Sequence, residues 1–301
     1  MKSGKKRGKV KPKKHRVGKR LTYVIVAIAA IILCFLVYST LNPQNPVQPD
    51  QTPKAAIIDH LSISQPNPDF RRTVETILNE TNLEVDYFSG EDVTVDFYRN
   101  LPSQNYRLII FRAHSTGECS VEGQPPFIVF FTSEPYSNVK HVSDQLAMHV
   151  VYVNFPGGGS PGYFGVTPTF INDCMKGTFN DTIIIAMGCD GLKYTSMAEA
   201  FIEKGARTYI SWNGPVSAPH TDLATATLLH HLITEKQTVK DAVAETMKEV
   251  GPDPNDKSLL TFHPDEAGNY VIPFSSEETT LDLAGIHKLL GDLQTVDPSR
   301  M

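Results

Sequence analysis

The sequence predicts an α/β protein in which a mostly parallel sheet carries helices on both faces. Two observations predict this class. Short apolar runs typical of buried strands alternate with amphipathic helical patterns, and turn residues separate them. A third observation adds one membrane helix before the domain, because residues 21–38 carry no charge. The segment 54–275, about 220 residues, is long enough to bury one hydrophobic core.

The N-terminal segment is basic and is followed directly by the apolar run. The first 20 residues hold eleven Lys and Arg and no Asp or Glu. The positive-inside rule therefore places 1–20 in the cytoplasm and the domain outside, in a single-pass protein of the cell membrane. A cleaved signal peptide is the alternative, but it would have a shorter apolar core and a small-residue cleavage site. We expect a basic tail (1–20), a transmembrane anchor (21–40) and a Pro-rich linker (41–53).

The charge of the remaining chain is strongly acidic. Of 28 Lys and Arg, 11 lie in the first 20 residues, which leaves 17 cations against 33 acidic residues. This balance argues against nucleic acid as a partner and suits basic partners. The sequence has no Cys-x-x-Cys or His-Glu-x-x-His spacing, so we expect neither a metal nor a cofactor. Three cysteines (Cys119, Cys174 and Cys189) follow the anchor, and in an oxidising compartment an odd number leaves one thiol over.

The expected elements follow in alternating order. Strands are predicted for 54–64, 83–88, 106–114, 181–187 and 207–212, with two more, 127–132 and 149–155, in an insertion. Helices are predicted after Pro68, from Thr94 as N-cap to Arg99, from Ser196 to Lys204, and around 223–232 and 239–250. Ser196 and Glu199 have the spacing of a capping box. The C-terminal segment, 276–301, holds one more amphipathic pattern around 281–290.

The carboxyl ends of the predicted strands hold the chemically interesting residues. Ligands of such sheets bind beyond these ends, where Asp59, His114, Cys189 and Trp212 lie. Cys189 follows an apolar strand and precedes a helix, a position that favours the thiolate. His114 ends a separate strand 75 residues earlier. It could exchange protons with a substrate held between it and the thiol, so the pair predicts a cysteine nucleophile with a histidine partner.

The stretches "RLIIFRAHSTG" and "TIIIAMGCDG", followed by "GARTYISWNGPV", resemble the caspase-like cysteine peptidases. That clan includes caspases, legumains, gingipains, separases and CHAT-domain proteins, and the resemblance covers about residues 54–250. It implies a caspase-like fold with Cys189 as nucleophile and His114 as general acid/base. It also implies that the backbone N–H groups of Cys189 and Ser115 hold the oxyanion. The chain departs from the pattern in placing Ser115, not glycine, after the histidine.

The resemblance further implies how a substrate would be recognised. The end of the first strand often lines the pocket for the residue before the scissile bond, and a carboxylate there, Asp59, would select Arg or Lys. Asp190 is a second candidate for that role, and Trp212 would form a wall along the extended peptide. We therefore expect a membrane-anchored, extracytoplasmic cysteine endopeptidase that cleaves peptide or protein substrates after a basic residue.

Two alternatives remain open from the residues. The first is a caspase-like binding module without activity at the cell surface, favoured by the serine at position 115. The second is an amidotransferase-like thiol hydrolase, for which His220 would be the partner of the cysteine.

Overall fold

The structure is a computed structural model that describes residues 53–79, 81, 83–119, 123, 125–154, 162–273 and 283–294, together with Tyr23 and Ile28. The chain divides into two units, Met1–Gln51 and Thr52–Met301. The predicted tail, anchor and linker fall almost entirely outside the described residues. Among the residues that are described, no helix is both long and apolar enough to cross a bilayer.

A six-stranded sheet in the order β10-β9-β8-β3-β1-β2 forms the centre of the second unit. Its strands are β1 (Lys54–Asp59), β2 (Glu84–Ser89), β3 (Tyr106–Arg112), β8 (Thr182–Ala186), β9 (Ala206–Trp212) and β10 (Leu260–His263). The first five are parallel, which confirms an α/β fold with a mostly parallel sheet. The sequence did not predict β10, which pairs with β9 in the antiparallel sense. The strand order reverses between β1 and β3, the place where doubly wound sheets bind ligands.

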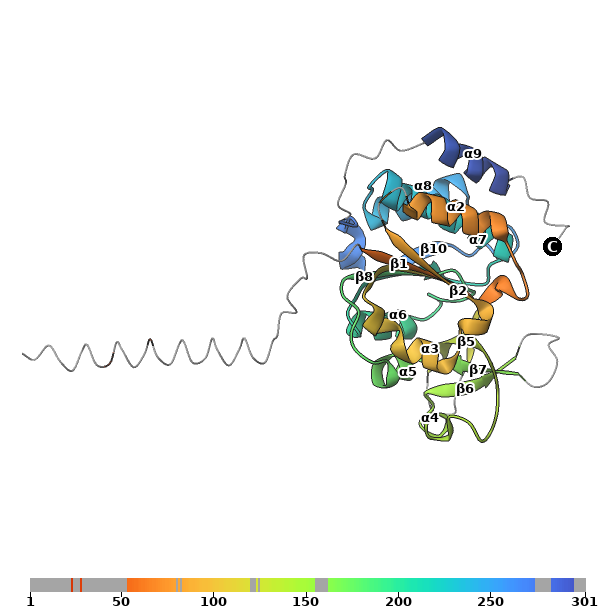
Figure 1. The fold of residues 1–301 in the computed structure, drawn as a ribbon, viewed down its shortest axis with the longest axis vertical. Coiled ribbons are helices and arrows are strands. Elements are labelled where there is room, and N and C mark those ends of the chain that lie inside the picture. The colour runs from red at the N-terminus through yellow and green to blue at the C-terminus, as the bar shows by residue number, and fades with distance from the viewer. Residues whose placement is uncertain are drawn as a thin grey trace, which may run out of the picture. The chain divides into compact units, whose positions relative to one another are not determined.

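Helices cover both faces of this sheet (Figure 1). One face carries α2 (Pro68–Asn79), α7 (Ala218–Leu229) and α8 (Val239–Glu249), and the other carries α3 (Val95–Asn100), α5 (Pro168–Cys174) and α6 (Ser196–Glu203). Alternate side chains of each strand enter two cores, with Ile57 in one and Ile58 in the other. Because both faces are buried, the strands are apolar throughout instead of alternating with polar residues.

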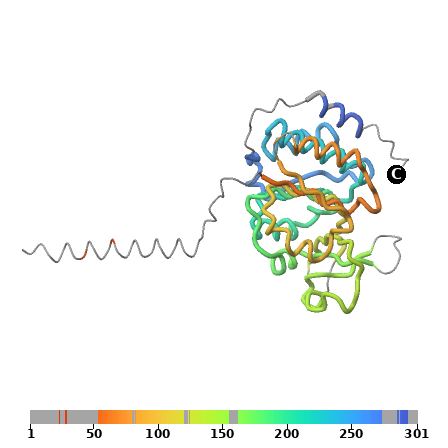
Figure 2. Tube along the Cα trace, in the orientation of Figure 1, coloured from red at the N-terminus to blue at the C-terminus, as the bar shows by residue number. Residues whose placement is uncertain are grey.

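The insertion forms a second sheet of four antiparallel strands. The strands are β4 (Ser115–Cys119), β5 (Phe127–Pro135), β7 (Tyr163–Val166) and β6 (Val150–Val153), in that spatial order, with α4 (Val142–Leu146) between β5 and β6 along the chain. The sequence predicted β5 and β6 but missed β4 and β7, which are short and contain glycine. In the tube of Figure 2 this sheet lies at the end of the unit away from α2, α7 and α8.

Of the two helix N-caps predicted from the sequence, the structure confirms one and contradicts the other. The Thr94 cap is confirmed, because its hydroxyl accepts a hydrogen bond from the Phe97 N–H at 3.1 Å. The capping box predicted at Ser196 is wrong. Ser196 is already helical, and the N-cap is Thr195, whose hydroxyl donates to the Glu199 carboxylate at 2.7 Å.

The C-terminal amphipathic pattern is a helix of the same unit, α9 (Leu283–Gln294). It contacts α2 and α7, and Ile286, Leu290 and Leu293 join the core on that side. The shorter helical turns are η1 (His60–Ser62), η2 (Gly90–Asp92), η3 (Leu101–Gln104), η4 (His230–Thr234) and η5 (Asp265–Asn269).

Candidate functional site

The predicted catalytic dyad, His114 and Cys189, lies on the loops that follow β3 and β8, and these two loops are in contact. The two strands are parallel neighbours, with Phe111 opposite Ala186. His114 and Cys189 therefore both lie beyond the carboxyl ends of the strands, at the same edge of the sheet. The Ser115 hydroxyl donates a hydrogen bond to the carbonyl oxygen of Cys189 at 2.6 Å. The structure therefore brings the segments of His114, Ser115 and Cys189 together.

Gly188 allows these two loops to meet. A Cβ at this position would lie 2.5 Å from the carbonyl oxygen of Ala113 and 3.0 Å from the amide nitrogen of Ser115. The first distance is shorter than any real contact of a Cβ with backbone. The glycine before the cysteine is therefore explained by the close approach of the loop after β3.

The amide of Ser115 faces the cysteine loop. Ser115 pairs with Phe130, and the neighbouring bond from the Phe131 N–H to the His114 carbonyl makes this a non-hydrogen-bonded pair. The Ser115 N–H thus points away from β5. Two residues on, the Gly117 N–H points the same way and donates to Asp190 Oδ2 at 3.2 Å. This orientation suits a donor to an oxyanion formed at Cys189.

The thiol of Cys189 is held by backbone and is protonated at neutral pH. Its Sγ lies 3.5 Å from both the nitrogen and the carbonyl oxygen of Val216, in the loop between β9 and α7. Burial raises the pKa of the thiol, the Val216 N–H opposes this, and the charge of Asp190 adds to it. The expectation of a thiolate at a helix N-terminus is not met, because α6 begins only at Ser196 and Cys189 lies in the preceding turn.

His114 is neutral and lies beside a second histidine. Burial, and next the charge of Arg112, lower the pKa of His114 to about 4. Its ring packs edge-on against His60, with 5.8 Å between the ring centroids. Burial and His114 lower the pKa of His60 to about 4 as well. A neutral imidazole can accept the proton of a thiol. Sequence reasoning missed His60, although it directly follows the end of β1 where the strand order reverses.

Asp59 has a structural partner instead of a substrate. Its side chain is 3% exposed, and Oδ1 accepts a hydrogen bond from Arg112 Nη1 at 2.9 Å. Arg112 also binds both carboxylate oxygens of Asp222 on α7, at 2.7 and 2.9 Å. Tyr87 donates to the other oxygen of Asp59 at 3.0 Å. Because this carboxylate is buried and already paired, it is not available to select a basic substrate residue.

The other two predicted substrate residues are also engaged within the protein. Asp190 is 5% exposed, accepts from Gly117 N–H and lies 3.7 Å from the Lys193 ammonium. Trp212 is completely buried, and its indole N–H donates to the Thr221 hydroxyl at 2.9 Å. Its ring therefore belongs to the core and forms no wall for a peptide.

Because His60 and His114 are buried as neutral side chains, we expect the folded protein to lose stability in acid. Their pKa values rise from about 4 in the folded chain to about 6.5 on unfolding, so the unfolded state binds more protons in this range. Their contribution is fully present above pH 6.5 and is lost as pH falls towards 4, by at most roughly 2–3 kcal/mol for each. In urea unfolding from pH 7 to pH 4, the His60→Gln variant should lose less stability than the wild type. Equal losses in both chains would contradict this.

A second thiol lies in a cluster that the sequence did not predict. Cys174 Sγ lies 3.0 Å from His149 Nδ1 and 3.7 Å from Asp144 Oδ1, and His149 Nδ1 lies 3.4 Å from the same oxygen. These three atoms, which are all of types that can bind a metal, lie within 4.8 Å of one another. The spacing of these residues along the chain matches no compact metal motif, and only the folding of α4, β6 and α5 brings them together. The protein thus contains a His/Cys/Asp group of the kind that thiol chemistry or metal binding requires.

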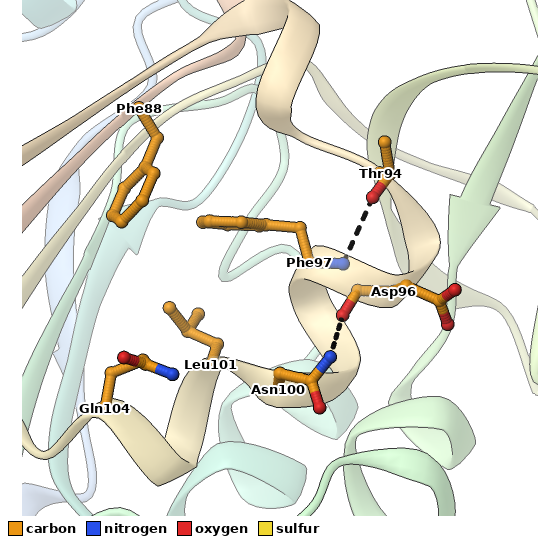
Figure 3. Close-up of a pocket in the computed structure, with 7 residues that line it drawn as sticks. All are labelled: Phe88, Thr94, Asp96, Phe97, Asn100, Leu101 and Gln104. Carbon is orange, nitrogen blue, oxygen red and sulfur yellow. Dashed lines mark hydrogen bonds between the residues drawn. The ribbon is translucent and has the colours of Figure 1, made fainter.

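A surface hollow of about 400 Å³ lies between β2, α3 and η3 (Figure 3). The rings of Phe88 and Phe97 and the side chain of Leu101 line it, and the two rings pack edge-on with centroids 4.8 Å apart. Its lining includes neither His114 nor Cys189. This hollow is therefore not the place where the predicted dyad would act.

Comparison with known proteins gives no assignment. No protein-family model matches the chain, and no curated protein matches it. The function is therefore inferred from the geometry of the candidate site.

Proposed function

We propose that the chain is a thiol hydrolase that cleaves peptide bonds, with Cys189 as nucleophile and His114 as general acid/base. The observation that carries this proposal is the convergence of the ends of β3 and β8, where Ser115 donates to the Cys189 carbonyl at 2.6 Å. A histidine and a cysteine at adjacent tips of a parallel sheet supply the two groups that acyl transfer needs.

The proposed reaction starts from the neutral pair. As Sγ attacks the peptide carbonyl, His114 takes the thiol proton, and the N–H groups of Ser115 and Cys189 stabilise the oxyanion. His114 then donates that proton to the leaving amine, which leaves a thioester. Water attacks the thioester, His114 accepts its proton and returns it to the sulfur, and the carboxylic acid departs. The lowered pKa of His114 makes its protonated form a ready donor to the amine.

The proposal extends to family and location. We assign the chain to the caspase-like cysteine peptidases on the strength of its strand-end residues. We also propose that residues 21–38 anchor it in the cell membrane with the catalytic domain outside, because the uncharged run follows a basic segment. Cleavage after a basic residue is not part of the proposal, since Asp59 and Asp190 already have partners.

The amidotransferase alternative is weaker than the peptidase. It needs His220 near the thiol, but His220 Nε2 lies 3.1 Å from the Gly251 carbonyl oxygen and its ring packs against Trp212, with 5.3 Å between the ring centroids. The inactive binding module is the remaining alternative, and the same assay distinguishes it.

The test uses the full-length chain and fluorogenic peptides with Arg, Lys, Asp, Asn or Leu before the reporter. We expect hydrolysis of at least one peptide by the wild type and by Cys119→Ser, which removes a thiol of the second sheet. We expect none by Cys189→Ala. Hydrolysis that survives Cys189→Ala would overturn the assignment of the nucleophile. A folded wild type that cleaves no peptide would favour the binding module.

A further inference from the structure

We propose that Asp144, His149 and Cys174 bind a zinc ion, with the fourth position open to water or another ligand. Asp144 lies in α4, His149 in the turn directly before β6, and Cys174 at the end of α5. Their atoms Oδ1, Nδ1 and Sγ form a triangle with sides of 3.0, 3.4 and 3.7 Å. This site is distinct from the proposed dyad and does not depend on it.

The triangle has the size of one face of a zinc tetrahedron. Zinc bonds of about 2.3 Å to sulfur and about 2.0–2.1 Å to nitrogen or oxygen separate neighbouring ligand atoms by roughly 3.3–3.6 Å. The measured sides scatter around that range. A zinc ion could therefore sit over this face with only small movements of the side chains, and the fourth vertex would point away from the three residues.

The backbone positions His149 before any ion binds. The His149 N–H donates to the Asp144 carbonyl at 2.8 Å, which fixes the loop between the two ligands. The Thr167 N–H and hydroxyl both donate to the His149 carbonyl, at 3.1 and 3.0 Å. Met148 adopts a left-handed conformation with φ of 60°, which a non-glycine residue keeps only when its surroundings demand it.

Outer partners orient two of the ligands. Asp173 Oδ2 lies 3.4 Å from His149 Nε2, so the ring can bind metal through Nδ1 and donate its other N–H to a carboxylate. This carboxylate–histidine arrangement is common around zinc and is worth about 10–100-fold in affinity. Arg99 binds Oδ2 of Asp144 at 2.7 Å and leaves Oδ1 directed at the cluster.

The charges around the site can accommodate a divalent cation. Arg99 is the neighbouring cation, and it also pairs with Asp96 at 3.2 Å. Three carboxylates (Asp96, Asp144 and Asp173) and the thiolate that forms on binding outweigh the combined charge of zinc and Arg99. Thiolate and imidazole favour zinc over calcium or magnesium, which prefer oxygen ligands.

The test measures metal binding by the full-length chain with Co²⁺ as a spectroscopic substitute and Zn²⁺ as competitor. We expect one equivalent of Co²⁺ to give the absorption of a thiolate–cobalt bond, and Zn²⁺ to abolish it. Cys174→Ser and His149→Ala should lose that absorption, and Asp173→Asn should weaken Zn²⁺ binding about 10–100-fold. Cys119→Ser is the matched control for a thiol outside the cluster and should behave as the wild type.

Thermal unfolding provides a second readout that needs no chromophore. Zn²⁺ should raise the Tm of the wild type and of Cys119→Ser, but not of Cys174→Ser, because only a folded chain presents the site. Zinc binding that is the same in the wild type and in Cys174→Ser would place the ion elsewhere and overturn the proposal. A wild type that binds neither Co²⁺ nor Zn²⁺ would also overturn it.

Discussion

Replacing Arg112 by methionine is expected to lower the free energy of unfolding by about 3–5 kcal/mol. The guanidinium is 1% exposed and pairs with Asp59 at 2.9 Å and with Asp222 at 2.7 Å. Removing it leaves two carboxylates in the protein interior without a cation, and burial already raises the pKa of Asp222 against the opposing effect of Arg112. Equilibrium unfolding in urea at pH 7 measures the change.

Arg107→Met is the matched control for this substitution. Arg107 lies on the same strand, and its ion pair with Asp181 is longer, at 3.7 Å, and partly exposed. Such pairs contribute at most about 1 kcal/mol. The difference in stability between the wild type and Arg112→Met should become smaller as pH falls, because protonation neutralises the two carboxylates that have lost their cation. If Arg112→Met lowers the free energy of unfolding no more than Arg107→Met does, the buried network does not stabilise the fold.

Replacing His114 by alanine is expected to lower kcat/KM for peptide hydrolysis by about 10²–10⁴-fold. Without the imidazole, no positioned base takes the proton of a thiol whose pKa is raised by burial, and no acid protonates the leaving amine. The sulfur itself remains, so slow alkylation of Cys189 by iodoacetamide at high pH should persist. Steady-state kinetics and mass spectrometry of the labelled peptide measure the two effects separately.

His220→Gln is the control that separates the two thiol mechanisms. His220 is bound to the Gly251 carbonyl and should be dispensable for a reaction run by His114 and Cys189. Loss of activity in His220→Gln with full activity in His114→Ala would reverse the assignment in favour of the amidotransferase-like hydrolase.

Much of the fold could be predicted because both faces of the central sheet are buried. Runs such as Ile183, Ile184 and Ile185 are apolar at every position, since they feed the two cores alternately. The strands β4, β7 and β10 were not predicted, because they have no continuous apolar run. They are short, and polar or glycine residues interrupt them. Their extended conformation therefore depends on pairing with neighbouring strands, which their local sequence pattern does not show.

The sequence predicts that the His114 and Cys189 segments lie close together, but it does not predict the protonation states of these two side chains. The adjacency of the His114 and Cys189 segments follows from their places after parallel strands, and the sequence contains that information. The protonation states do not follow from sequence, because burial and the charges of Arg112 and Asp190 set them. His60 was missed since nothing in its local pattern shows that the end of β1 lies beside the end of β3.

The α/β class, the parallel core strands and the positions of a histidine and a cysteine at strand ends can all be predicted from the sequence. These features depend on local periodicity, which is written residue by residue along the chain. The pairing of Asp59 with Arg112 and the cluster of Asp144, His149 and Cys174 become visible only in the folded chain. Such contacts join segments distant in sequence, and a carboxylate or thiol has the same local pattern whether its partner is a substrate, a metal or a buried arginine.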